Sequence, residues 1–131
     1  MPANAALTAG TGSFSVQLRT AGLRTVTASN ITDNTKTANT SPNITVNPGV
    51  FTKLQLLVPG ETAAPGTSTG KTDTPNAQTA GTSFNVTVNA VDAHWNLVNT
   101  VTDTVGITSS DANAQLPANA ALTAGTGSFS V

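Results

Sequence analysis

The 131-residue chain contains no cysteine, and only 8% of its residues are charged. Without cysteine, neither a disulfide framework nor a thiolate metal site can form. Its five basic and six acidic residues are scattered singly along the chain, so there is no basic stripe that would neutralise a phosphate backbone. We therefore expect no nucleic-acid partner.

Long apolar runs are missing as well. The run Leu56–Val58, with Leu54 nearby, is far shorter than the ~20 residues that cross a bilayer as a helix. We expect no membrane span. Apolar residues nowhere recur at helical spacing over three turns, whereas threonine, asparagine, alanine, serine and glycine are abundant. This balance predicts an all-β protein with short strands and polar turns.

One segment occurs twice. Residues 2–16 reappear without a single change at residues 117–131, an offset of 115 residues. This offset is about the size of one Ig-type domain, and a fixed period is the signature of a repeat architecture. In that register, residues 1–49 are the C-terminal half of one repeat and residues 50–131 are the N-terminal half of the next.

Alternation of apolar and polar residues marks the expected strands. It predicts strands at residues 51–58 and 84–90, and a last strand at 43–47 before Pro48-Gly49. The breakers in residues 59–81 predict a long loop with at most a short edge strand. Residues 92–96 predict a turn.

Weaker patterns predict further strands. Residues 97–101 and 104–109 are rich in β-branched side chains, and brief strands are expected near 115–116 and 121–122. Near the N-terminus, residues 14–19 and 25–29 predict a β-hairpin. Together these strands yield a set of expected core or inter-subunit side chains: Phe14, Val16, Leu18, Val26, Ile44, Val46, Leu54, Leu56, Phe84, Val86 and Val88.

Several phrases resemble the repeats of very large bacterial surface proteins, whose Ig-like domains are related to the invasin and filamin-type sandwiches. The matching phrases are Val88–Asn96, Thr108–Asp111, Leu7–Gly10, Phe14–Val16 and Arg19–Gly22. The resemblance implies an Ig-like Greek-key β-sandwich, exported to the bacterial cell surface as a spacer or adhesive domain. In that family the turn usually has glycine at the position that Trp95 occupies here.

The junction between the halves is short. Pro48-Gly49-Val50 reach only ~10 Å, whereas a sandwich is several times longer. We expect that the two halves of one chain cannot pack together and that the back half of one molecule completes the front half of another. Identical subunits would then form a head-to-tail polymer by domain or strand swapping, with the two copies of the repeated segment competing for one slot. The alternative is a circularly permuted monomer with the overlap unpaired.

Catalytic chemistry has little support. His94 is the only histidine, and a triad with Asp92 and Ser109 or Ser110 lacks the glycine pattern of a nucleophile elbow. We expect no enzymatic activity.

Asp92, Asp103 and Asp111, with Asp73, are weak candidates for calcium, because no calcium-loop spacing gathers three of them. Capping of turns by Asp92 and Asp111 is the favoured interpretation, and no cofactor is expected. Trp95, with Asn96 and Asn99 nearby, supports an alternative function in which its ring stacks on a sugar and the chain is a monomeric, glycan-binding adhesin domain.

Overall fold

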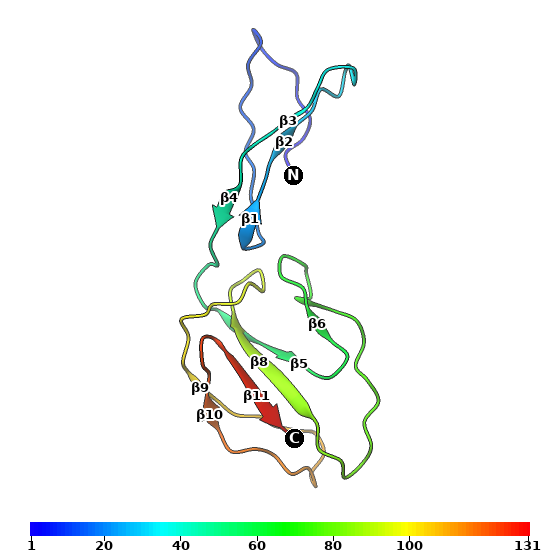
Figure 1. Cartoon of the computed structure of the whole chain (residues 1–131), viewed down its shortest axis with the longest axis vertical. Helices are drawn as coiled ribbons and strands as arrows, with labels where there is room; N and C mark the ends of the chain where they lie inside the picture. The colour runs from blue at the N-terminus through cyan, green and yellow to red at the C-terminus, as the bar shows by residue number, and fades with distance from the viewer. The chain divides into compact units, whose positions relative to one another are not determined.

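The computed structural model describes all residues, 1–131. It is all-β, as predicted, and contains no helix (Figure 1). Accordingly, it has no helix of the length and apolarity needed to cross a membrane. The chain divides into two compact units, Met1–Asn47 (unit 1) and Pro48–Val131 (unit 2). That these units are halves of successive repeats stays a prediction.

A three-stranded antiparallel sheet forms the centre of unit 2, in the order β11-β8-β5 (Figure 1). Its strands are β5 (Lys53–Leu57), β8 (Asn85–Val91) and β11 (Thr126–Ser130). The strands expected at 51–58 and 84–90 are therefore confirmed. β8 is the middle strand because its alternating valines and asparagines allow one face to be buried while both edges pair.

Two short strand pairs complete unit 2. They are β6 (Thr62–Ala63) with β7 (Lys71–Thr72), and β9 (Thr104–Val105) with β10 (Ala120–Ala121). The loop expected at 59–81 thus contains a small hairpin. The strand expected at 97–101 is reduced to a bridge between Leu97 and Val91, and none forms at 115–116.

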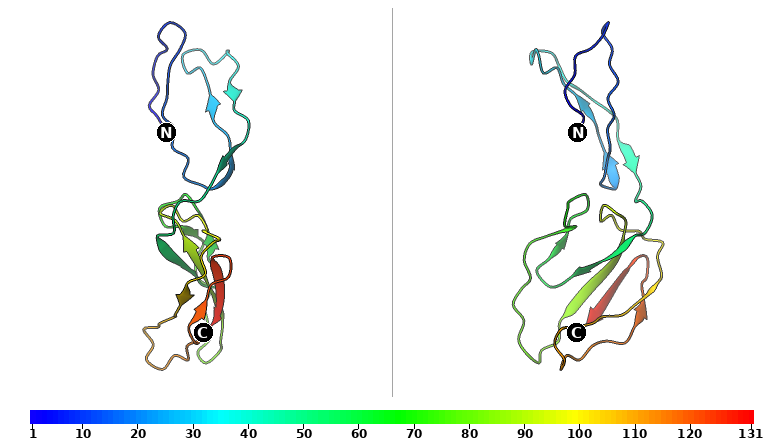
Figure 2. Two further views of the ribbon diagram at one scale, coloured as in Figure 1. Left: turned by 90° about the vertical axis from the view of Figure 1, so that its left-hand side faces the viewer. Right: turned by 180° about the vertical axis from the view of Figure 1, so that it is seen from behind.

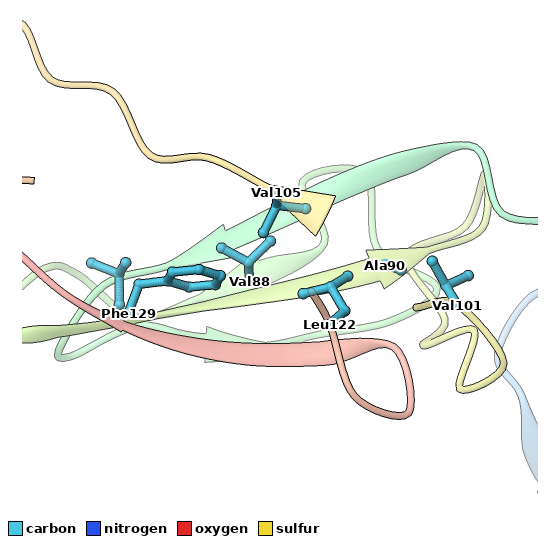
Figure 3. Packing of buried hydrophobic residues seen from close by; sticks show 7 residues of the cluster. Val88, Ala90, Val101, Val105, Leu122 and Phe129 are labelled. Atoms are coloured by element: carbon cyan, nitrogen blue, oxygen red, sulfur yellow. The ribbon is translucent and has the colours of Figure 1, made fainter. Parts of the chain in front are cut away.

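The core lies against one face of the β8–β11 pair (Figure 3). Val86, Val88 and Ala90 of β8 point into it beside Phe129 of β11. Three side chains from the β9–β10 region pack against them: Val101, Val105 and Leu122. These seven residues are the hydrophobic core of the molecule.

Unit 1 consists of two strand pairs, which Figure 2 shows from two further sides. β1 (Gly22–Arg24) pairs with β4 (Ile44–Val46), and β2 (Thr27–Ala28) pairs with β3 (Asn39–Thr40). No residue of this unit is fully buried. The strand expected at 43–47 is confirmed as β4.

The hairpin expected between residues 14–19 and 25–29 is wrong. Residues 12–19 belong to no strand, and β1 pairs with β4 instead. Alternation of apolar residues fixes which side chains share a face, but a strand also needs a partner for its backbone groups. The sequence pattern of residues 14–18 does not identify that partner.

The residues expected in the core fall into three groups by their burial within one chain. Val86 and Val88 are buried. Leu18, Val26, Val46 and Phe84 are half-buried. The exposed ones are Phe14, Val16, Ile44, Leu54 and Leu56. A role for the exposed residues between subunits stays a prediction.

Candidate functional site

The two copies of the repeated segment make the same turn. In each copy the outer threonines exchange two backbone hydrogen bonds of 2.9 and 3.1 Å, Thr8 with Thr11 and Thr123 with Thr126. The central residues have positive φ in both, 50° and 79° at Ala9-Gly10 and 49° and 75° at Ala124-Gly125. Positive φ at both central residues is typical of the tight turns that join antiparallel strands. The segment therefore forms this turn in either place.

Side chains next to the turn also pack alike. A Cβ atom on Gly12 would lie 2.9 Å from Cδ2 of Leu7 and 3.3 Å from Cε2 of Phe14. On Gly127 it would lie 3.0 Å from the same atoms of Leu122 and Phe129. In both copies a leucine and a phenylalanine close over a glycine, so this small apolar cluster is set by the segment itself.

The surroundings of the two clusters differ. Leu122 and Phe129 are 2% and 5% exposed, whereas Leu7 and Phe14 are 60% and 43% exposed. The second copy pairs with β8 along the whole of β11, from Thr126 to Ser130. The first copy has the shape of a core element but belongs to no core.

Unit 2 leaves part of its core face uncovered. Leu54 and Leu56 of β5 pair directly with Ala90 and Val88 of β8, so they share the face that carries the core. They are nevertheless 45% and 44% exposed. The core face is therefore covered over β8 and β11 and open at the edge formed by β5.

A groove adjoins the end of the β8–β11 ladder. Phe84 and Val131 exchange backbone hydrogen bonds of 2.8 and 2.9 Å at that end. Their side chains line a groove of ≈ 690 Å³ together with Leu56, Val58 and Ile107 and the loop 78–83. Polar residues, among them Ser109, Asp111 and Asn113, line the groove as well, and its apolar part, at Leu56, Phe84 and Ile107, suits a hydrophobic side chain.

The opposite face of the sheet carries a row of polar side chains that fixes its register. Asn89 Nδ2 donates to Gln55 Oε1 (2.9 Å), and the Thr126 hydroxyl donates to Asn89 Oδ1 (2.8 Å). Gln55 is buried because its Nε2 donates to the carbonyl of Gly70 (2.6 Å) in the loop that covers it. The sequence pattern does not reveal this row, since Gln55 lies between two leucines in an apolar strand.

Asp92 is a buried anchor at the end of β8. Its carboxylate accepts hydrogen bonds from the backbone N–H groups of Gly49 (2.7 Å), His94 (2.8 Å) and Asn96 (2.9 Å), and from Asn96 Nδ2 (2.9 Å). Burial alone would raise the pKa of Asp92, but these hydrogen bonds outweigh it and lower the pKa from 3.8 to about 2. The predicted turn at 92–96 is confirmed, and its Asp also ties in the segment before β5.

Trp95 occupies the turn with φ of 69°, a left-handed conformation that explains why glycine suits this position. Its indole N–H donates to the carbonyl of Ser68 (3.3 Å), and Lys53 Nζ lies 3.4 Å from the ring centroid. Gly70 lies so close that a Cβ atom there would overlap the ring. The ring is thus packed by its own chain, and it is not a free platform for sugar stacking.

The residues considered for calcium and catalysis are not assembled into a site. No group of three or more His, Cys, Asp or Glu side chains is placed to hold a metal ion, so Asp92, Asp103 and Asp111 do not come together. Asp111 caps a turn by accepting from the N–H of Asn113 (2.9 Å), as expected. Asp92 binds the backbone of His94 rather than its ring, and therefore does not orient a catalytic imidazole.

The chain was also compared with known proteins. No protein-family model, no curated protein and no solved structure matches it. The candidate site is therefore defined by the molecule itself: the unpaired first copy and the open core face of unit 2.

Proposed function

We propose that the chain is a structural repeat module of an extracellular bacterial surface protein or filament, self-assembling head to tail by complementation of split Ig-like domains. One observation carries this proposal. Residues 117–131 complete the core of unit 2, whereas the identical residues 2–16 hold the same turn and the same apolar cluster in the open. A segment shaped for a core that it does not occupy is what a split repeat would donate to a neighbour.

Each unit exposes apolar side chains that its own residues leave uncovered. Unit 2 exposes Leu54 and Leu56 on its core face, and unit 1 exposes Leu23 and Ile44 on its paired strands β1 and β4. Unit 1 contains strands without a buried core, and unit 2 contains a core with an open side. Unit 1 of one molecule is therefore a suitable cover for unit 2 of another.

Magnitudes indicate what such an assembly requires. Fully burying a leucine or isoleucine stabilises by about 1.5–3 kcal/mol, and these four side chains are 39–59% exposed. Their burial would contribute on the order of 3–5 kcal/mol, close to the lower limit of the cost of association. Apolar contact alone is thus insufficient, and strand pairing across the interface has to contribute as well.

The scarcity of charge favours that pairing. Only 8% of the residues are charged, so few like charges would oppose contact between strand edges. The resemblance of Val88–Asn96 and the related phrases to surface-protein repeats supports the extracellular assignment.

Light scattering after size exclusion tests the proposal. We expect a mass that rises with concentration in multiples of 13.1 kDa between 1 µM and 1 mM, and rod-like or filamentous particles in electron micrographs. Leu56→Ser should shift this rise to higher concentration, whereas Leu97→Ser, at an exposed leucine outside the three-stranded sheet, should not. A mass of 13.1 kDa at every concentration would contradict self-assembly.

The monomeric adhesin is the competing function. It requires an accessible aromatic surface, and Trp95 is engaged by Lys53, Ser68 and Gly70. A monomer that binds glycans and loses this binding in Trp95→Ala would favour the adhesin over the structural module.

A further inference from the structure

We propose that the chains assemble by strand exchange, in which residues 2–18 of one copy replace residues 117–131 of another along β8, and Leu18 of the incoming copy fills the groove beside Phe84. This inference rests on the proposed function, because it specifies the contact through which the subunits join. It commits to one partner, a second copy of this chain.

Identity of sequence fixes the register of the incoming strand. β11 pairs with β8 from Thr126 opposite Asn89 to Ser130 opposite Asn85. The repeat offset of 115 residues converts these pairs into Thr11 opposite Asn89 and Ser15 opposite Asn85. Every backbone and side-chain contact of β11 is available to the incoming copy, including the hydrogen bond from the threonine hydroxyl to Asn89.

The turn favours exchange because it is already formed. Residues 8–11 have the hydrogen bonds and positive φ angles of residues 123–126, and Leu7 and Phe14 already close over Gly12. A turn that is already formed loses less conformational entropy when the segment binds. The first copy is thus pre-organised for the slot that the second copy fills.

Residues 17 and 18 extend the first copy beyond the 15 repeated residues. In the same register Val16 comes opposite Phe84, Gln17 opposite Ser83, and Leu18 opposite Thr82. Leu18 shares the face of Phe14 and Val16, because side chains alternate along a strand. That face is the one that carries the core, so Leu18 would lie at the groove lined by Phe84 and the loop 78–83, with Val16 in the place of Val131.

Competition between the copies makes the exchange depend on concentration. The second copy belongs to the same chain as β8, and such tethering gives an effective concentration on the order of millimolar. At 10 µM protein, tethering therefore favours the second copy by about 100-fold. The incoming copy brings Leu18 and the apolar side chains of the β1–β4 pair that follows it, and these contacts would offset the effect of tethering.

A pair of cysteine variants reports which copy lies beside β8, and the absence of natural cysteine leaves no competing thiol. Thr87 and Ser128 are opposite one another on the face away from the core. The hydrogen bonds between Phe84 and Val131, and from Ala90 to Gly125, place Thr87 and Ser128 at a non-hydrogen-bonded position. Cα atoms there are about 4.5 Å apart, which allows a disulfide. Ser13 is the matching residue of the first copy.

Two double variants are oxidised with glutathione disulfide at 1 µM and 1 mM, and the products are separated without reductant and mapped by mass spectrometry. Exchange predicts that Ser13→Cys with Thr87→Cys gives covalent oligomers at 1 mM. It also predicts that Ser128→Cys with Thr87→Cys, which closes within one chain at 1 µM, loses at least half of its cross-link at 1 mM. Adding Leu18→Asp to the first double variant should lower the oligomer yield at least tenfold, and Ile31→Asp, at an exposed side chain of unit 1, should leave it unchanged.

The outcomes separate the exchange from the proposed function. If light scattering shows oligomers at 1 mM while the Ser128–Thr87 cross-link stays complete and the Ser13–Thr87 pair remains reduced, subunits join without exchange and this inference is overturned. If the protein is monomeric at every concentration, the proposed function fails together with the exchange. A Ser13–Thr87 cross-link found only within one chain would contradict both.

Discussion

Residues 2–16 and 117–131 are one amino-acid sequence in two structural environments. In the second environment the segment forms β10 and β11, and its leucine and phenylalanine are buried. In the first it forms the same turn and the same leucine–phenylalanine contact over glycine, but no strand. Local sequence therefore determines the turn, whereas a strand and its burial depend on a partner such as β8.

Removing the phenylalanine ring from each copy gives the largest expected contrast. In dilute solution, Phe129→Ala should lower the free energy of unfolding of unit 2 by about 3–5 kcal/mol, because it removes a buried ring from the core. Phe14→Ala should change it by less than about 0.5 kcal/mol, as is usual for an exposed side chain. Urea unfolding followed by the fluorescence of Trp95, the only tryptophan, measures both. Equal losses of stability would contradict the difference in burial between Phe129 and Phe14.

Substituting alanine for the turn glycine probes how the surroundings of the backbone differ between the two copies. Gly10 and Gly125 have similar φ angles, but a Cβ atom at Gly125 would lie 2.3 Å from the carbonyl oxygen of Val98, whereas at Gly10 it would meet nothing within 4 Å. Both substitutions carry the strain of a left-handed alanine, about 1 kcal/mol. Overpacking against Val98 should add about 2 kcal/mol for Gly125→Ala. Thermal unfolding should separate the two variants by several degrees, and the absence of any difference would show that the turn of the second copy is not held by its surroundings.

Acidification should lower the stability of unit 2 through Asp92. The pKa of Asp92 lies at about 2 in the folded protein and at 3.8 ordinarily, so its contribution is complete above about pH 4 and is lost as the pH falls through about 2. The contribution amounts to about 2 kcal/mol and belongs to unit 2, because unit 1 contains no buried carboxylate.

Urea unfolding at pH 6, 4, 3 and 2, detected by Trp95 fluorescence, should show this loss. Asp92→Asn should be less stable at pH 6 and should lose less stability on acidification than the unsubstituted chain. A pH profile that is the same with and without this substitution would contradict the role of the carboxylate.

Salt should have the smallest effect. Exposed charges are screened within about 8 Å at physiological ionic strength, and the exchange joins strands that carry almost no charge. The midpoint concentration of assembly should therefore change less than about threefold between 50 and 500 mM sodium chloride, as measured by light scattering. A change of tenfold or more would indicate that ion pairs, rather than strand pairing, hold the copies together.

Much of the fold follows from the sequence. Alternating residues located β5, β8 and β4 because each has apolar residues at every second position and a breaker beside it. The turn at Asp92 followed from a side chain that caps backbone amides. Both are local properties, and a single sequence is sufficient to reveal them.

The remainder depends on contacts distant in sequence. The hairpin expected at residues 14–29 does not form, because the same alternation fits any partner strand of suitable register. In unit 1, β1 pairs with β4 instead. The burial of Gln55 could not be predicted, since it depends on a loop that covers the side chain and whose Gly70 carbonyl accepts its hydrogen bond. Exposure of Leu54 and Leu56 likewise reflects what covers β5 rather than the strand itself.

Hydrogen exchange at the amides of the two copies measures directly which copy is paired with β8. Peptides that extend into Gln17–Leu18 or back to Leu116 distinguish the first copy from the second. At 1 µM, residues 126–130 should be protected and residues 11–16 should exchange rapidly. At 1 mM, residues 11–16 should become at least tenfold more protected, because they then pair with β8 of a neighbour. Rapid exchange of residues 11–16 at both concentrations would contradict the account.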